Sequence, residues 1–264
     1  MPELAEVEWF RKQWDAGRGQ KIVGLGMHDR KRVFRGSNTR AMQEKLVGSR
    51  LEGSTAHGKR MLFKFSGANW LGVHLGMTGK IRVENSDFRA SKHDHLVLYQ
   101  SEHALVFADS RQFGRVRFHH GDSEPEWWKS VAPEIVSREF NQKFFAQFLD
   151  RHRQAPIKGV LLMQNGFPGI GNWMADEILW RARVLPSRRT RKLAERERIA
   201  IFRATKFVVK GSLETLGRDF SDPPQNWLIH QKWKRNGVCP KHRTLLRCST
   251  VAGRTTVWCG RCQR

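Results

Sequence analysis

The spacing of apolar residues changes along the chain, and each pattern predicts a different kind of element. Within residues 2–16, four apolar positions recur at helical spacing behind a Pro-Glu pair that suits a first helical turn. From Lys21 to about His120, short apolar runs alternate with turn residues, which is typical of an antiparallel sandwich or barrel. We therefore predict an N-terminal helix followed by an antiparallel β-sandwich, together residues 1–121.

The second half of the chain follows a different pattern. Residues 122–135 are polar, contain proline and lack clear periodicity, so they are predicted to form a linker. Residues 136–222 carry helical patterns that end where Asp222 is followed by two prolines. Residues 223–264 are predicted to form a loop and a small cysteine-bearing module. The expected fold is therefore α+β and multidomain.

Composition adds the expected partner. The chain has 264 residues, of which 39% are hydrophobic, enough to bury a real core. Lys and Arg number 48 against 25 acidic residues, and the formal net charge of +23 favours a polyanion, with nucleic acid first. A basic surface that serves solubility or faces a membrane is the alternative interpretation.

Neither membrane insertion nor secretion is expected. No run approaches the ~20 apolar residues that a membrane span needs, and the N-terminus lacks the basic and apolar regions of a signal peptide. We therefore expect a cytoplasmic protein, associated with the nucleoid if it is bacterial, that has no membrane partner.

The four cysteines fall in the last 26 residues, which suits a metal site better than a disulfide framework. Cys239 and His242 form a C-x-x-H pair, and Cys259 and Cys262 form a C-x-x-C pair. Two such pairs can supply four tetrahedral ligands for one structural zinc ion, and a module this small needs ligation to fold. Cys248 in place of His242 is the alternative fourth ligand, and a module without metal is the other alternative.

The N-terminus offers a nucleophile. Once Met1 is removed, Pro2 carries a secondary amine, and an α-amino group with a pKa of about 8 is partly neutral at neutral pH. Attack on a sugar carbon yields an iminium ion, an electron sink that assists loss of the base and later elimination. Glu3 and Glu6 lie beside Pro2 in the sequence for proton transfer. A helix N-terminus favours an ionised carboxylate, so Glu3 needs burial before it can act as an acid.

A Pro-Glu pair that merely opens a helix is the alternative interpretation of this segment. Retention of Met1 would block the nucleophile, because the amino group of Pro2 would then be part of a peptide bond.

Several motifs together resemble one family. MPELAEVE opens the chain, VHLGMTGK and DSRQFG occur in its first half, PIKGVLLMQNGFPGIGNWMADEIL in its second, and GRTTVWCGRC near its end. With these motifs the chain resembles the formamidopyrimidine-DNA glycosylase and endonuclease VIII family over nearly its whole length. The resemblance implies a helix-two-turns-helix domain and a β-hairpin zinc finger. It also implies a bifunctional DNA glycosylase and abasic-site lyase of base excision repair that works through β,δ-elimination.

The resemblance further implies catalytic roles for individual residues. Pro2 would be the Schiff-base nucleophile and Glu3 the proton donor, while Ala5 replaces a proline of the family motif. Lys59, in the segment HGKRMLF, would help to bind phosphate and assist β-elimination. Arg254 would contact the phosphates of the lesion from the tip of a β-turn and assist δ-elimination.

A second group of residues is implied to contact DNA. An enzyme that acts at a base-bearing sugar carbon takes the nucleotide out of the stack, and apolar wedges with an arginine offset part of that cost. Met77, Arg111 and Phe113 would fill the resulting hole, and Asn172 would cap a helix and donate to a phosphate. Ordinary packing is the alternative for the apolar members. The implied DNA-binding residues are Glu6, Met77, His93, Arg111, Phe113, Arg153 and Asn172.

Two departures from the family pattern bear on the metal and the substrate. His242 stands where the family has a cysteine ligand. The stretch from Asp219 to Cys239 is shorter than in many relatives. Where those enzymes carry the loop that closes over an oxidised purine, it contains a different sequence, SDPPQNWLIHQKWKR. Oxidised purines such as 8-oxoguanine and formamidopyrimidines are the favoured substrates, and oxidised pyrimidines are the alternative.

The expected partner is damaged double-stranded DNA, bound by a monomer without a small-molecule cofactor. Two other classes of protein stay open: a non-catalytic protein that recognises damaged DNA, and an RNA-binding zinc protein. Pro2, Glu3 and Lys59 argue against the first of these. Whichever nucleic acid is bound, phosphate contacts should make binding depend strongly on salt.

Overall fold

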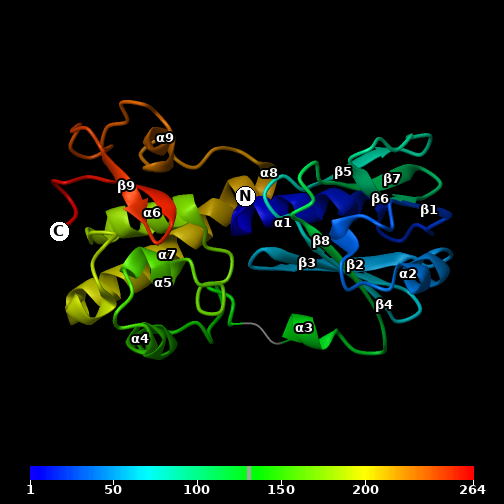
Figure 1. Cartoon of the computed structure of the whole chain (residues 1–264), viewed down its shortest axis with the longest axis horizontal. Helices are drawn as coiled ribbons and strands as arrows, with labels where there is room; N and C mark the ends of the chain where they lie inside the picture. Colours follow the sequence, from blue (N-terminus) through cyan, green and yellow to red (C-terminus); the bar gives the residue numbers. More distant parts are fainter. Residues whose placement is uncertain (130–131) are drawn as a thin grey trace. The chain divides into compact units, whose positions relative to one another are not determined.

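The computed structural model describes residues 1–129 and 132–264, and these residues form two compact units (Figure 1). The first unit contains Met1–Pro2 and the chain from Glu6 to the end of helix α3. The second contains Glu3–Ala5 and Ala132–Arg264. Each unit has its own hydrophobic core.

The first unit contains two four-stranded sheets in which every pair of neighbouring strands is antiparallel. Short strands with buried β-branched and aromatic residues between turn residues form such sheets because alternate side chains reach the core. One sheet has the order β1 (Gly24–Met27), β6 (Asp94–Tyr99), β7 (His103–Ala108), β5 (Lys80–Asn85). The other has the order β2 (Leu51–His57), β3 (Arg60–Phe65), β4 (Asn69–His74), β8 (Arg115–His120).

Side chains from both sheets share one core, which confirms the predicted antiparallel sandwich. Leu71 of β4 and Phe107 of β7 are fully buried in the same cluster. Helix α1 (Leu4–Gln13) continues into a 3-10 turn, where Trp14 packs against Phe63 with ring centroids 4.6 Å apart. The predicted N-terminal helix is present, although it begins at Leu4 rather than at Pro2.

Two short helices complete the first unit. Helix α2 (Thr39–Leu46) begins behind Asn38, whose side-chain oxygen accepts a hydrogen bond from the backbone N–H of Ala41 at 3.0 Å, as an N-cap should. Helix α3 (Glu126–Lys129) carries Trp127, which packs close against β4. A Cβ atom at Gly72 would lie 2.2 Å from that indole, so glycine is required there.

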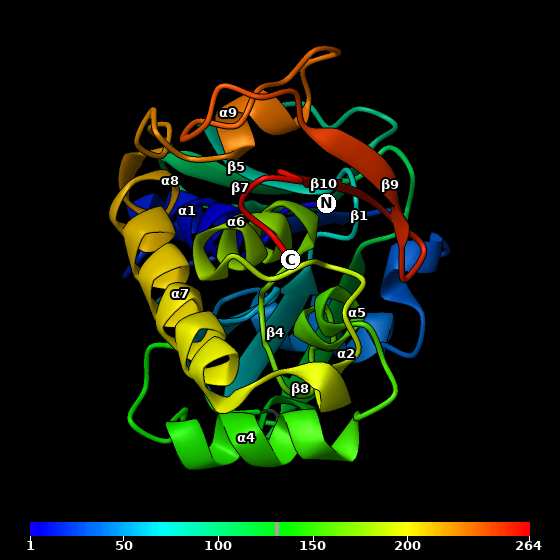
Figure 2. The same ribbon diagram turned by 90° about the vertical axis from the view of Figure 1, so that its left-hand side faces the viewer.

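The second unit is helical and ends in a β-hairpin. Helix α6 is buried at seven successive positions and packs against the long helix α7, beside which α4 lies (Figure 2). Two residues of the predicted linker, 130 and 131, lie outside the described residues. The elements are α4 (Gln142–Arg151), α5 (Ile157–Leu161), α6 (Asn172–Ala182), α7 (Glu195–Glu214), α8 (Leu216–Asp219), α9 (Ile229–Lys232), β9 (Arg247–Val251) and β10 (Arg254–Trp258).

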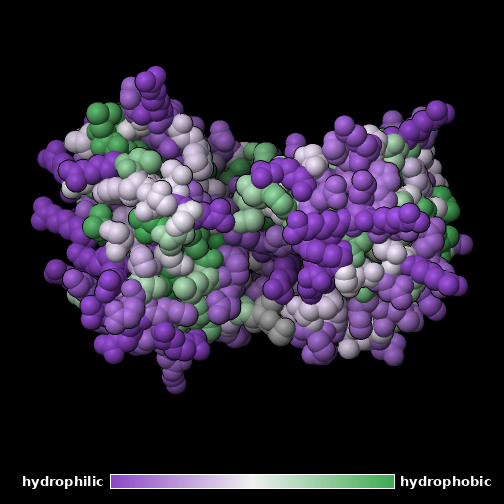
Figure 3. All heavy atoms as spheres, viewed as in Figure 1, coloured by the Kyte–Doolittle hydropathy of each residue, from purple (hydrophilic) through white to green (hydrophobic). Residues whose placement is uncertain are grey.

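Hydrophilic residues cover most of the visible face of each unit, with smaller apolar areas between them (Figure 3). Within residues 1–129 and 132–264, no helix combines the length and the apolar character that crossing a bilayer requires.

Candidate functional site

The carboxylate of Glu3 caps the N-terminus of α6. Its oxygens accept hydrogen bonds from the backbone N–H groups of Gly171 at 2.9 Å, Trp173 at 2.9 Å and Met174 at 3.2 Å. These are the N–H groups that an α-helix leaves without internal partners, and a carboxylate is favoured at this end of the helix dipole. The side chain is only 3% exposed, so the burial that the sequence analysis required of Glu3 is present.

The predicted capping role of Asn172 is wrong. Helix α6 begins at Asn172 itself and Gly171 precedes it, and the capping oxygens come from Glu3. A Cβ atom at Gly171 would lie 2.3 Å from the Glu3 carboxyl group, so only glycine leaves room for this arrangement. The side-chain N–H of Asn172 donates instead to the backbone carbonyl of Thr255 on β10 at 3.0 Å.

The hairpin of β9 and β10 presents Arg254. Strand residues Val251 and Arg254 pair across a two-residue turn, in which Ala252 and Gly253 both have positive φ, 50° and 72°. Two such residues in succession are typical of the tight turns whose twist matches paired strands. Arg254 is exposed directly after the turn, where the resemblance placed it.

A buried cluster of charges fixes β10 to the helices. Asp176 of α6 is fully buried, pairs with Lys158 of α5 at 2.7 Å and with Lys232 of α9, and accepts from the backbone N–H of Val257 at 3.1 Å. Both lysines also donate to the carbonyl of Thr255, at 3.2 Å from Lys158 and 3.4 Å from Lys232. Burial lowers the pKa of Lys158, against the opposing effect of Asp176. Sequence reasoning missed this cluster, because its members lie far apart in the chain.

The four predicted metal ligands lie together. Each residue offers one ligand atom, and these four atoms lie within 4.8 Å of one another; the residues are Cys239, His242, Cys259 and Cys262. The indole N–H of Trp180 donates to the sulfur of Cys239 at 3.3 Å, a contact that helps to orient this side chain. The donor set of three sulfurs and one imidazole fits a tetrahedral metal ion.

Cys248 is not a member of this cluster. It lies on β9 opposite Val257 and is exposed, whereas the three clustered cysteines are buried. The alternative in which Cys248 replaces His242 is therefore wrong.

In the first unit, two loops carry the predicted hole-filling residues. Met77 follows β4, and Arg111 and Phe113 precede β8. The side chains of Met77 and Phe113 are 43% and 40% exposed, although both are apolar. The guanidinium of Arg111 lies 4.7 Å from the centre of the Phe113 ring. The structure thus brings the three residues onto neighbouring loops.

Asp109 joins the two loops. This fully buried carboxylate accepts from the hydroxyl of Thr78 at 2.6 Å and from the backbone N–H of Gly114 at 2.6 Å. The backbones also meet directly, since a Cβ atom at Gly76 would lie 2.5 Å from the nitrogen of Gly114. Gln112, between the two exposed residues of the second loop, holds a positive φ of 54°.

Lys59 and His74 lie near one another at one end of β3 and β4. Lys59 is 8% exposed and directly precedes β3. Burial, followed by the charges of Lys59 and two arginines, lowers the pKa of His74 to about 4. Its Nδ1 accepts from the backbone N–H of Gly76 at 3.0 Å, as a neutral imidazole can. His74 stands in the VHLGMTGK motif, yet sequence reasoning did not single it out.

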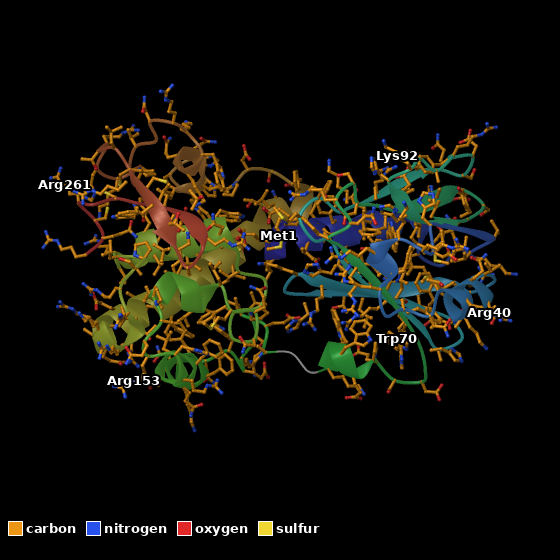
Figure 4. All side chains as sticks on the ribbon, viewed as in Figure 1. Met1, Arg40, Trp70, Lys92, Arg153 and Arg261 are labelled. Atoms are coloured by element: carbon orange, nitrogen blue, oxygen red, sulfur yellow. The ribbon has the colours of Figure 1, made fainter. Side chains whose placement is uncertain are left out.

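The remaining predicted DNA contacts are less constrained. Glu6 lies in α1 and is partly buried. The carbonyl of His93 accepts from the backbone N–H of Asp109 at 3.0 Å, so its backbone is tied to the loop of Arg111. Arg153 is exposed, and Figure 4 shows it on the surface of the second unit after α4.

A basic hollow of about 580 Å³ lies beside the metal-ligand cluster. Its cationic residues all belong to the second unit, and Arg261 extends into solvent there (Figure 4). It contains neither Glu3 nor Asn172, so it is separate from the helix cap described above. The basic residues that line it are Arg183, Arg196, Lys241, Arg261 and Arg264.

Comparison with known proteins gives a consistent result. The model of the formamidopyrimidine-DNA glycosylase N-terminal domain matches residues 1–116, and the model of the formamidopyrimidine-DNA glycosylase H2TH domain matches residues 131–222. The formamidopyrimidine-DNA glycosylase of Pelotomaculum thermopropionicum is 32% identical over 100% of this chain and 99% of that protein. The enzyme of the same name from Thermus thermophilus is 33% identical over 100% of this chain and 98% of that protein.

Solved structures agree. The complex of wild-type Lactococcus lactis Fpg with DNA containing an oxidized pyrimidine is 27% identical, with a TM-score of 0.89 over 100% of both chains. The same organism's formamidopyrimidine-DNA glycosylase bound non-covalently to DNA with an abasic site is 27% identical, with a TM-score of 0.87 over 99% of both chains.

Proposed function

Because the chain belongs to the formamidopyrimidine-DNA glycosylase family, we propose that it is a DNA glycosylase of base excision repair that also cleaves the strand as an abasic-site lyase. One observation carries the proposal. The residue after Pro2 is a buried carboxylate fixed by three backbone N–H groups at the start of α6. A nucleophilic amine next to a positioned proton carrier is the combination that this chemistry needs.

Pro2 acts as the nucleophile once Met1 has been removed. Its nitrogen forms a bond to C1′ of the damaged nucleotide, the glycosidic bond breaks, and the base leaves with the bonding electron pair and a proton. Glu3 donates the proton that the departing base takes up. The nitrogen of Pro2 then loses its proton, and its lone pair forms a C1′=N⁺ double bond while the C1′–O4′ bond breaks and O4′ takes up a proton. The resulting iminium ion on the ring-opened sugar acidifies C2′–H. Removal of this proton expels the 3′ phosphate, and a second elimination expels the 5′ phosphate.

Lys59 and Arg254 bind the phosphates that leave in these eliminations. Lys59 is nearly buried, and the charge it adds to its surroundings helps to keep His74 neutral. Arg254 projects from the β9–β10 hairpin. The backbone carbonyl of the next residue, Thr255, accepts hydrogen bonds from Lys158, Asn172 and Lys232. Asn172 and Arg153 supply further DNA contacts in the second unit, and Glu6 and His93 supply them in the first.

Met77, Arg111 and Phe113 fill the space that the extruded nucleotide leaves. Exposed apolar side chains are costly in water, and insertion into a base stack buries them. The contacts of Asp109 support this role, because they fix the two loops relative to one another before DNA binds.

The preferred substrates are oxidised purines, 8-oxoguanine and formamidopyrimidines. Excision of oxidised pyrimidines is the second candidate activity. The Lactococcus lactis relative supports keeping both candidates, because the wild-type protein was solved with DNA that contains an oxidized pyrimidine and a mutant of it with DNA that contains Fapy-dG.

The metal held by Cys239, His242, Cys259 and Cys262 is one structural zinc ion. Three sulfurs and one imidazole nitrogen match its preference for tetrahedral nitrogen and sulfur ligands. Bound zinc would supply folding free energy to a module that has little apolar core of its own. Its ligands hold the ends of the segment that contains the Arg254 hairpin.

We further propose that a monomer works without a small-molecule cofactor in the cytoplasm, associated with the nucleoid if the protein is bacterial. The three-part division into residues 1–121, 136–222 and 223–264 stays a prediction, as does the linker 122–135.

Borohydride trapping tests the proposal. The wild-type protein, incubated with duplex DNA that contains an abasic site in the presence of borohydride, should become covalently attached to the strand, because reduction fixes the iminium ion. Mass spectrometry of the adduct should place the link on Pro2. Intact binding without any adduct would leave only a non-catalytic DNA-binding protein, and preference for single-stranded RNA over duplex DNA at moderate salt would favour an RNA-binding protein.

A further inference from the structure

Trp233 differs from every other tryptophan of the chain. All ten tryptophans lie within the described residues, and nine of them are buried or partly buried. Trp233 is 67% exposed. It lies between α9 and the metal-ligand cluster, and nothing in the proposed mechanism uses it.

The chain around Trp233 is firmly held. Helix α9 begins where Glu177 of α6 accepts from the backbone N–H groups of Leu228 at 2.7 Å and Ile229 at 3.3 Å. Trp227, just before it, is 2% exposed and packs against Trp173 with ring centroids 6.4 Å apart. Trp233 is therefore exposed although the segment that carries it is anchored to α6.

One face of the indole is supported by a fixed cation. The ammonium of Lys232 lies 4.8 Å from the centre of the Trp233 ring, within the range of a cation–π contact. Lys232 itself is only 5% exposed and is ion-paired to the buried Asp176. The ring is thus fixed from behind while most of its surface faces solvent.

The same cation connects Trp233 to the proposed catalytic groups of the second unit. The carbonyl of Thr255 accepts from Lys232 at 3.4 Å and from Asn172 at 3.0 Å. Arg254, which directly precedes Thr255, is proposed to hold the phosphates of the lesion. The indole, the α6 N-terminus and the hairpin arginine therefore share one rigid frame.

Stacking on a nucleobase is what a supported, exposed indole can do for a DNA substrate. In duplex DNA each base is already stacked on its neighbours, so a protein ring gains little from them. A base removed from the helix has lost this stacking, and an aromatic side chain can replace it. We propose that Trp233 stacks on the extruded base and so helps to select the substrate. This inference rests on the proposed function.

Selection should follow the shape of the base. Flat aromatic lesions such as 8-oxoguanine and 5-hydroxycytosine present a full π face to the indole. Ring-saturated lesions such as 5,6-dihydrouracil are puckered and present none, so they gain less. An abasic site has no base and gains nothing.

The test compares three duplexes under single-turnover conditions: one with 8-oxoguanine, or with 5-hydroxycytosine if that is excised faster, one with 5,6-dihydrouracil, and one with a preformed abasic site. The variants are Trp233→Ala, Trp233→Phe and Leu245→Ala. Leu245 is a matched control, because it is also 67% exposed in the same unit. Thermal unfolding and zinc content of each variant show whether the fold is kept.

We expect Trp233→Ala to slow excision of the flat base by about 5- to 100-fold, the range for loss of one base–aromatic stack. Cleavage at the abasic site should stay within about twofold of wild type, and the loss on 5,6-dihydrouracil should be smaller than on the flat base. Trp233→Phe should recover most of the rate, and Leu245→Ala should match wild type.

Two results would overturn the inference alone: wild-type excision by Trp233→Ala, or an equal loss at the abasic site, which would show a merely structural role. A wild-type protein that neither excises a base nor cleaves an abasic site would overturn the proposed function and, with it, this inference.

Discussion

The two units hold their proposed site residues by different means. In the first, the hole-filling residues Met77, Arg111 and Phe113 are exposed, and one buried carboxylate, that of Asp109, joins their loops through neutral donors. In the second, the acting groups are polar or charged, and buried opposite charges join the elements that carry them.

The difference follows from what each group must do. A side chain that enters a base stack must be presented by a loop of defined shape. Hydrogen bonds from uncharged backbone N–H and hydroxyl groups can fix that shape. A group that moves protons or binds phosphate needs a fixed direction, and paired charges in a buried setting resist displacement because separating them is costly. The comparison predicts that loss of the Glu3 cap or of the buried ion pairs in the second unit impairs the chemical step, whereas loss of the Asp109 anchor between the two loops of the first unit weakens recognition.

The largest effect is expected for Glu3→Gln. Base excision should fall by about 10²- to 10⁴-fold, the usual contribution of a positioned proton carrier, while cleavage of preformed abasic sites continues. The amide oxygen can still accept from the N–H groups of α6, so the helix cap is kept in part. Single-turnover assays on the two duplexes measure both steps. Wild-type excision would remove Glu3 from the mechanism.

Next is Asp176→Ala, which leaves two buried lysines without their shared carboxylate. Removal of one partner from a buried ion pair costs about 3–5 kcal/mol, so the melting temperature should fall by roughly 10 °C. Glu126→Ala is the matched control, because its pair with Lys129 in the first unit is exposed and should contribute little. Equal melting temperatures for the two variants would contradict the distinction between the units.

A smaller effect is expected for Asp109→Ala. The buried N–H of Gly114 and the hydroxyl of Thr78 lose their acceptor, at a cost of about 1–3 kcal/mol, and the two loops lose their common anchor. Binding to lesion-containing duplex should weaken by about tenfold, with little change at the chemical step. Thr78→Val, which removes one of these bonds, should give an intermediate result. If the Asp109→Ala variant bound lesion-containing DNA normally but reacted slowly, Asp109 would support the chemical step rather than DNA binding.

The smallest effect concerns pH. The pKa of His74 is lowered to about 4 in the folded chain, below its ordinary value of 6.5. The unfolded chain therefore takes up a proton as pH falls below about 6.5 while the folded chain does not, so His74 contributes stability above this range and loses it toward pH 4. His74→Gln should flatten that decline by at most about 3 kcal/mol, measured by urea unfolding between pH 4 and 7.

Glu177 gives the opposite trend in the second unit. Burial raises its pKa to about 7 from an ordinary 4.5, although Arg181 and two backbone N–H groups act against this. Between about pH 4.5 and pH 7 the folded chain keeps a proton on Glu177 that the unfolded chain releases. The contribution of Glu177 to the stability of the folded chain therefore declines as pH rises toward 7. Glu177→Gln should therefore change the pH dependence of the unfolding free energy in the opposite direction from His74→Gln. A change in the same direction would contradict the opposite trends expected for these two residues.

Much of the fold follows from local patterns. The β-sandwich could be predicted because its strands are short, apolar and bounded by turn residues. The metal ligands could be predicted because their pairs lie close in sequence. The helices on either side of the glycine-rich segment before Asn172 could be predicted from their helical spacing, and the family resemblance implied the turns between them.

Other features depend on contacts that no local pattern contains. Asn172 looked like an N-cap because its residue type suits that position, but Gly171 precedes the helix and the capping oxygens come from Glu3, 168 positions before Gly171 in the chain. Asp176, Lys158 and Lys232 appeared as isolated polar residues, and only the fold pairs them. Trp233 could be read in the sequence, but its exposure could not, since most tryptophans here are buried or partly buried.

The position of Cys248 has a practical consequence. It is the exposed thiol among the four cysteines, and it lies on β9, directly across from β10, the strand that begins with Arg254. A thiol-reactive fluorophore should therefore attach there selectively while the metal ligands stay shielded. Such a label would report, in real time and without any engineered mutation, when the hairpin engages DNA.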